Sequence, residues 1–166
     1  SVLATSPQET AVAPNLTARE NLELMAGIYG ASSKEAKDKA TEMIQRFNLT
    51  SIENTKAKKL SGGWQRRLSI AMALISEPKL LFLDEPTLGL DILARRELWT
   101  IIRQLKGKTT IILTTHYLEE AEALSDRIGI MKNGSLLAVG TVEELNAAVG
   151  TNDFETAFVS IVKEGA

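Results

Sequence analysis

Residues 59–91 read KLSGGWQRRLSIAMALISEPKLLFLDEPTLGLD, and this stretch decides the expected fold. A serine and two glycines come early in it, and after them apolar residues recur at helical spacing as far as Pro78. The run LLFL at 80–83 is short and continuously apolar, as is typical of strands buried on both faces of a parallel sheet. An aspartate and a glutamate follow it directly. The stretch therefore predicts a helix with a glycine-rich beginning and a buried strand with an acidic end.

The residues that follow continue an α/β pattern. The run TTIILTT at 109–115 is apolar and β-branched, and Asp91 can cap a helix that separates it from the first strand. A strand, a helix and a strand in this order make a βαβ unit, which belongs to a parallel sheet. Farther on, Asn133-Gly134 lies between two strand-like runs, which is the strongest short signal for a β-hairpin. The predicted fold class is therefore α/β.

The residues before this stretch are predicted to be helical. Capping-box patterns begin at Thr17 and at Ser32, and each is followed by apolar residues along one helical face. A chain of 166 residues fits one domain. Within residues 1–166 we predict a helical subdomain at 16–76, an α/β portion at 77–150 and a C-terminal helix at 151–166.

The composition excludes several classes of protein. Hydrophobic residues make up 44% and charged residues 24% of the chain, which argues against a disordered or fibrous protein. The net charge of −2 predicts no general attraction to nucleic acid, so we expect no nucleic-acid partner. The chain has no cysteine, which excludes a disulfide framework and a thiolate metal site. No apolar run is long enough to cross a bilayer, so we expect any role at a membrane to depend on a partner.

Asp84 and Glu85 lie where the first of these strands ends, and that edge of a parallel sheet is where such folds bind ligands. An aspartate there can hold Mg²⁺, and a neighbouring glutamate can polarise a water molecule for attack on a phosphoryl group. For an isolated Asp-Glu pair, however, a polar turn at the end of a strand is the better interpretation.

Ser61, Gly62 and Gly63 immediately precede the predicted helix. Unpaired backbone N–H groups and the positive end of the helix dipole can bind an anion there, and glycines allow a phosphate to approach the backbone closely. On its own, this tripeptide is better interpreted as an N-cap serine with two flexible residues. Its occurrence one helix before Asp84 and Glu85 favours a phosphate-binding function over both simpler interpretations.

These motifs resemble those of the nucleotide-binding domains of ATP-binding cassette (ABC) transporters. Five segments follow the family's order: TSPQET with the Q-loop glutamine Gln8, LSGGWQRR as the signature motif, LLFLDEP as the Walker B strand, LGLD ending at Asp91 as the D-loop, and TTIILTTH with the switch histidine His116. The runs LDEPTLGLD, TTHYLEEAEALSDRI and GTVEEL bring the chain nearer to the ATPases of drug, sodium or polysaccharide exporters. The implied fold is the C-terminal part of a P-loop NTPase (RecA-like) parallel-sheet domain with an inserted helical signature subdomain.

The resemblance also implies cofactors, partners and residue roles. The cofactors would be ATP and Mg²⁺, and the activity would be ATP hydrolysis coupled to export of a substrate across a membrane. Glu85 and His116 would be catalytic, and Asp84 with Gln8 would hold the metal. The implied ATP-binding residues are Gln8, Ser61, Gly62, Gly63, Gln65 and Asp91, of which Ser61, Gly62 and Gly63 act on the nucleotide of a second ATPase domain. The other implied partner is a transmembrane permease subunit, which would hold the protein at the inner, cytoplasmic face of the cell membrane.

Two features depart from the family pattern. Trp64 occupies the signature position that usually holds glutamine, and Gln65 follows it. The phosphate-binding pattern G-x-x-x-x-G-K-[ST] does not occur in the 166 residues, so we expect the chain to begin downstream of that loop and to be inactive in isolation. Two alternatives stay open: a partner-binding module without a P-loop or ATPase activity, and a soluble ABC ATPase that acts in translation.

Overall fold

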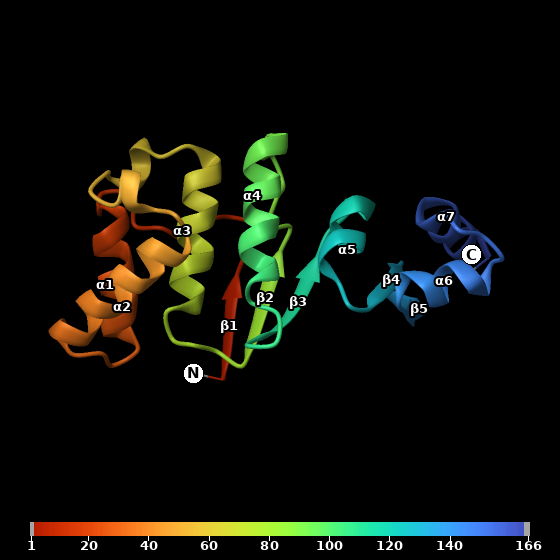
Figure 1. Ribbon diagram of the computed structural model, residues 1–166, viewed down its shortest axis with the longest axis horizontal. Coiled ribbons are helices and arrows are strands. Elements are labelled where there is room, and N and C mark those ends of the chain that lie inside the picture. Colours follow the sequence, from red (N-terminus) through yellow and green to blue (C-terminus); the bar gives the residue numbers. More distant parts are fainter. Residues whose placement is uncertain (1, 165–166) are drawn as a thin grey trace. The chain divides into compact units, whose positions relative to one another are not determined.

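The computed structural model describes residues 2–164, and the chain divides between Thr114 and Thr115 into two compact units (Figure 1). Within the described residues, the first unit contains three strands and four α-helices, and the second contains two strands and three α-helices. None of the helices described has the length and hydropathy of a membrane span.

The sheet of the first unit is parallel, with the strand order β1-β2-β3. These strands are β1 at Leu3–Ser6, β2 at Leu80–Asp84 and β3 at Thr110–Thr114. Ser6 pairs with Leu83, and Asp84 pairs with Thr114, so the three strands end at the same edge of the sheet. Helix α4, at Ile92–Arg103, connects β2 to β3. The predicted βαβ unit and the α/β fold class are therefore confirmed.

The two faces of this sheet differ in burial. Ala4 and Leu81 pair with each other and are buried, whereas Leu3 and Ile112 on the opposite face are 51% and 45% exposed. Helix α3, at Gly62–Leu74, packs against β1 and β2. The prediction that the strands are buried on both faces is therefore wrong for the described residues, because helices of this unit cover the face of Ala4 and Leu81 only.

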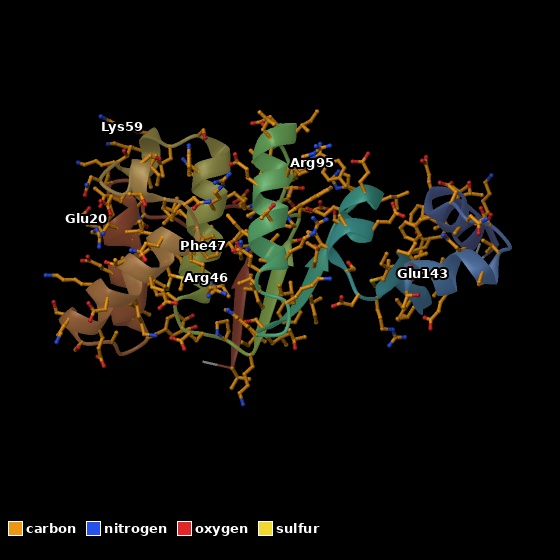
Figure 2. The ribbon with its side chains drawn as sticks, viewed as in Figure 1. Glu20, Arg46, Phe47, Lys59, Arg95 and Glu143 are labelled. Atoms are coloured by element: carbon orange, nitrogen blue, oxygen red, sulfur yellow. The ribbon has the colours of Figure 1, made fainter. Side chains whose placement is uncertain are left out.

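The helical part of the first unit begins with two capped helices. Helix α1 is Ala18–Ile28 and helix α2 is Ser33–Arg46, with short 3₁₀ turns at Thr50–Ile52 and Ala57–Lys59 after them. Both predicted capping boxes are present: Thr17 Oγ1 accepts from the Glu20 N–H at 3.1 Å, and Ser32 Oγ accepts from the Glu35 N–H at 3.4 Å. The Thr17 N–H donates to the Glu20 carboxylate in return, and this bond lowers the pKa of Glu20. Figure 2 labels Glu20 at the start of α1.

Helix α3 is buried around its whole circumference. All residues from Arg66 to Leu74 are buried, whereas the sequence predicts a helix whose apolar residues recur at helical spacing along one stripe. The helix packs against α1 and α2 on one side and against β1, β2 and α4 on the other (Figure 1). It has no solvent-facing side over these residues, so its polar side chains must find partners inside the unit.

The second unit is built around the predicted β-hairpin. Its elements are α5 at Leu118–Leu124, β4 at Ile128–Lys132, β5 at Ser135–Gly140, α6 at Val142–Ala148 and α7 at Phe154–Glu164. Asn133 and Gly134 have φ angles of +49° and +77°, and a two-residue type I′ turn requires positive φ at both positions. Ile130, Leu145, Phe154 and Ala157 form the buried core of this unit. The hairpin prediction is therefore confirmed.

Candidate functional site

Three of the predicted site residues lie at the edge where β1 and β2 end. Gln8 follows β1 and is exposed, Asp84 is the last residue of β2, and Glu85 comes directly after it. The strand ends are side by side because Ser6 pairs with Leu83. Polar groups from two segments that are far apart in the sequence therefore share one edge of the sheet.

Glu85 has an unusual backbone conformation. Its φ angle is +46°, in the left-handed region, which costs a non-glycine residue about 1–2 kcal/mol. Hydrogen bonds on both sides hold it there: the Glu85 N–H donates to the Thr114 carbonyl at 3.0 Å, and the Glu85 carbonyl accepts from Arg66 Nη2 at 2.8 Å. The side chain is half-buried, so its direction is set by a backbone that neighbouring elements fix.

Asp84 offers one carboxylate that is oriented but still accessible. Its Oδ1 accepts a hydrogen bond of 2.5 Å from the Thr114 hydroxyl, and the residue is exposed. Within residues 2–164, no group of three or more Asp, Glu, His or Cys side chains could hold a metal ion. Mg²⁺ commonly binds through only one or two carboxylates and completes its shell with water and phosphate oxygens. Asp84 therefore fits a magnesium ion that arrives with a phosphorylated ligand.

The beginning of α3 has the features of an anion site. Ser61 occupies the N-cap position and is exposed, but its side chain makes no capping hydrogen bond in the described structure. A Cβ atom added to Gly62 would meet nothing within 4 Å, so the backbone there is open to a ligand. The same atom on Gly63 would contact the Ala94 and Leu90 side chains at 3.6 and 3.7 Å. The simpler interpretation, a serine that caps its own helix, is not realised.

Gln65 and Trp64 are engaged within the chain. Gln65 Nε2 donates to the Ala57 carbonyl at 3.0 Å, and its Oε1 accepts from the Thr10 hydroxyl at 3.4 Å. The half-buried Trp64 ring lies 4.8 Å from the Arg67 guanidinium, at cation–π distance. The structure thus gives Trp64 a packing role, and the assignment of Gln65 to ATP binding stays a prediction.

Asp91 caps helix α4, as the sequence predicts. Its Oδ1 accepts from the Leu93 N–H at 2.9 Å and from the Ala94 N–H at 3.0 Å. Ala94 also lies beside Gly63, so the cap holds the start of α4 against the start of α3.

Removing this cap should destabilise the chain. We expect Asp91→Ala to lower the free energy of unfolding by about 1 kcal/mol, because two helix N–H groups lose their acceptor. Asp91→Asn keeps an acceptor oxygen and should retain most of the stability. Urea denaturation of the three proteins measures the difference, and equal losses in both variants would contradict the capping role.

His116 lies in the second unit, whereas the other predicted site residues lie in the first. It is exposed, and its ring centroid is 4.2 Å from that of Tyr117 with the two planes tilted by 41°. Its assignment as a catalytic residue stays a prediction.

Arg66 is a residue of this region that the sequence analysis missed. The residue is only 4% exposed, and its guanidinium donates to the Pro7 carbonyl at 2.5 Å and to the Asp84 carbonyl at 3.2 Å, in addition to the Glu85 carbonyl. The available signal was a pair of arginines directly before the mostly apolar run LSIAMAL, because a cation that is buried with such a run needs specific partners.

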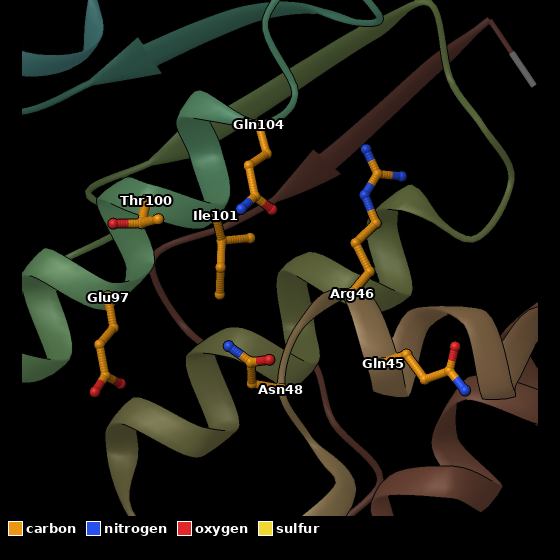
Figure 3. Close-up of a pocket in the computed structure, with 7 residues that line it drawn as sticks. All are labelled: Gln45, Arg46, Asn48, Glu97, Thr100, Ile101 and Gln104. Atoms are coloured by element: carbon orange, nitrogen blue, oxygen red, sulfur yellow. The ribbon is translucent and has the colours of Figure 1, made fainter.

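A cavity of about 360 Å³ lies elsewhere in the first unit, between the end of α2 and α4 (Figure 3). Polar side chains line most of it, including Arg46, Asn48 and Gln104. None of the predicted site residues lines this cavity. The candidate site is therefore the open edge of the sheet and the start of α3, not an enclosed pocket.

Comparison with known proteins decides the family. The family model described as "ABC transporter" matches residues 1–88, which is more than half of the 166 residues. The chain belongs to the ABC transporter family. A solved ABC structure, described as the ATP-binding subunit of an ABC transporter, has a TM-score of 0.81 and 30% identity, over 96% of this chain and 68% of that chain. The resemblance to ABC transporters that the sequence motifs indicate is therefore confirmed.

Two further ABC proteins resemble the chain. The daunorubicin resistance ATP-binding protein DrrA3 of Streptomyces coeruleorubidus is 44% identical over 144 residues, which are 86% of this chain and 46% of the relative. A dimeric, post-hydrolysis structure of the ATP-binding cassette MJ0796, bound to ADP and Pi, has a TM-score of 0.74 and 29% identity, over 85% of this chain and 63% of that chain. The chain thus spans about half the length of the resistance protein that it matches.

Proposed function

We propose that the chain is part of the ATP-binding subunit of an ABC transporter, which couples ATP hydrolysis to export of a substrate. The observation that carries this proposal is the shared edge of the sheet, where Asp84 and Glu85 follow one strand and Gln8 follows its parallel neighbour. Carboxylates at the carboxyl edge of a parallel sheet suit phosphoryl chemistry, in which positioning and electrostatics supply most of the rate enhancement.

The proposed site residues would have different roles in ATP hydrolysis. Asp84, with Gln8, would hold Mg²⁺, which when bound would neutralise phosphate charge. Glu85 would accept a hydrogen bond from the attacking water and orient it. We assign His116, by the family pattern, to the end of the nucleotide that carries the γ-phosphate. The bond from the Thr114 hydroxyl supports this scheme, because it orients the Asp84 carboxylate through Oδ1 while the residue stays exposed.

The start of α3 would act on a second nucleotide. The exposed Ser61 and the open backbone at Gly62 suit a phosphate that approaches from outside the chain. We therefore propose a second ATPase domain as partner, with Gln65 and Asp91 near the seam between the two domains. The dimeric state of the related cassette MJ0796 supports such an arrangement.

The transport direction and the membrane partner are also part of the proposal. The match to a daunorubicin resistance ATP-binding protein supports export. ATP hydrolysis would be coupled to a transmembrane permease subunit. Such a subunit would hold the protein at the cytoplasmic face of the membrane.

The test compares the isolated chain with the complete subunit and its membrane partner. We expect the 166 residues alone to bind Mg-ATP only at millimolar concentrations or not at all and to hydrolyse none, because they contain no G-x-x-x-x-G-K-[ST] loop to hold the phosphates. The complete subunit with its partner should hydrolyse ATP, and a transported compound should stimulate it. Calorimetry measures ATP binding, and phosphate release measures ATP hydrolysis.

Two outcomes would contradict the proposal. Micromolar, magnesium-dependent ATP binding by the isolated chain would show that the missing loop is not needed. A complete subunit that binds its partner without hydrolysing ATP would favour a partner-binding module instead.

A further inference from the structure

Arg66 connects three segments of the first unit through one buried side chain. It belongs to α3, and its guanidinium donates to the carbonyls of Pro7, Asp84 and Glu85, at 2.5, 3.2 and 2.8 Å. Pro7 precedes Gln8, while Asp84 and Glu85 end and follow β2. The planar guanidinium presents donors in fixed directions, so one side chain can hold carbonyls from two strand ends at once.

These bonds act on the backbone conformation of Glu85. Its left-handed conformation is unfavourable for a residue with a Cβ, and it persists only where surrounding structure holds it. The Glu85 carbonyl accepts from Arg66 Nη2 at 2.8 Å and from the Leu88 N–H at 3.1 Å, and on the other side of the residue the Glu85 N–H donates to the Thr114 carbonyl. Without the guanidinium, the Glu85 carbonyl loses the shorter of these two bonds, so Glu85 is less restrained against rotation toward more favourable φ and ψ values, and its carboxylate would turn with it.

A second contact fixes the position of Arg66 relative to β1. One helical turn farther along α3, the Ser69 hydroxyl hydrogen-bonds to the Ser6 hydroxyl at 3.1 Å, and both residues are buried. Helix α3 is thus attached to the end of β1 at two points, Ser69 and Arg66. A displacement of α3 along its axis must disturb the carbonyl contacts at both strand ends.

We propose that Arg66 is a positioning residue, which sets the direction of the Glu85 carboxylate and the location of Gln8 and ties both to the position of α3. This proposal rests on the proposed ATPase function. Because α3 also carries Ser61 at its beginning, Arg66 links the outward-facing anion site to the edge of the sheet within one chain.

The test uses the complete subunit with its partner and compares three variants. Arg66→Gln removes both the positive charge and the forked guanidinium donors. Arg66→Lys keeps the charge, but its ammonium group cannot reach carbonyls at two strand ends simultaneously. Arg67→Gln is the matched control: Arg67 is the next residue on α3, it is also buried, and its guanidinium pairs with Glu97 and lies over Trp64.

We expect both Arg66 variants to lower kcat about tenfold, with KM for ATP changed by less than about threefold, since the Asp84 carboxylate keeps its bond to Thr114 and stays available to the metal. The Arg67 variant should keep kcat per folded molecule, even if its stability falls. If Arg66→Lys has wild-type kcat, charge alone suffices and the bridging role is wrong. A change confined to KM, or equal kcat losses in the Arg66 and Arg67 variants, would also overturn the proposal.

Hydrogen exchange separates this proposal from the proposed function. In both Arg66 variants the Glu85 amide should exchange about tenfold faster than in wild type, and in the Arg67 variant its rate should be unchanged. This measurement needs no turnover. If the wild-type protein hydrolyses no ATP, the proposed function fails, and the exchange of the Glu85 amide alone decides whether Arg66 positions that residue.

Discussion

Replacing Glu85 with glutamine should reduce ATP turnover of the complete protein by a factor of about 10² or more while ATP binding persists. The substitution keeps the size of the side chain and removes the negative charge that would orient the attacking water. Asp84 is unchanged, so the proposed metal ligand remains. Steady-state phosphate release gives kcat, and equilibrium binding of radiolabelled ATP gives the affinity.

Glu77→Gln is a suitable control for this experiment. Among the described residues, Glu77 is the other glutamate with positive φ, at +51° against +46° for Glu85, but its carboxylate pairs with Lys39 on α2. The control should therefore retain turnover. Near-normal hydrolysis by the Glu85 variant would show that Glu85 is not catalytic. The simpler interpretation, a polar turn at the end of β2, would then hold.

Replacing Ser61 with arginine should reduce turnover about a hundredfold, through the nucleotide of the partner domain. The residue is exposed at the beginning of α3, and the Gly62 backbone next to it is open, so a long cationic side chain would occupy the space proposed for a phosphate. The fold should tolerate the change, because the serine side chain makes no capping bond.

A mixed dimer identifies which nucleotide is affected. One subunit carries an inactivating substitution in its own phosphate-binding loop, and Ser61→Arg is placed either in that subunit or in the other. If Ser61 acts across the interface, ATP turnover should fall only when Ser61→Arg lies in the subunit with the inactivated loop, because the Ser61 of that subunit faces the intact loop of the other. Ser33→Arg, at an exposed serine that begins α2, is the control and should have no effect in either position. Equal losses from both placements of Ser61→Arg would contradict action in trans.

Features that depend on neighbouring residues in the sequence could be predicted. The capping boxes at Thr17 and Ser32, the cap at Asp91 and the turn at Asn133-Gly134 each involve residues at most three positions apart. Their physics is local, so the pattern of residue types suffices to identify them. The grouping of Gln8 with Asp84 and Glu85 was implied by the family resemblance, and the register of β1 against β2 shows that these two strands end side by side.

Features that depend on packing could not be predicted. The sequence indicates one apolar stripe on α3, but the helix is buried all round because α1, α2, α4 and the sheet surround it. The role of Arg66 follows from that burial, and no spacing rule reveals that its partners are carbonyls 18, 19 and 59 residues away. The contacts of Gln65 with Ala57 and Thr10 were missed for the same reason.

The left-handed conformation at Glu85 has a consequence for protein engineering. Glycine adopts this conformation without steric cost, so Glu85→Gly should raise the thermal stability of the chain while it removes the carboxylate. A mutant library selected only for heat resistance would therefore enrich glycine or asparagine at position 85, and with Glu85 in its proposed role the most stable clones would be the ones that no longer hydrolyse ATP. Directed evolution of this protein would therefore have to keep codon 85 fixed, or select for the proposed transport activity and for stability together.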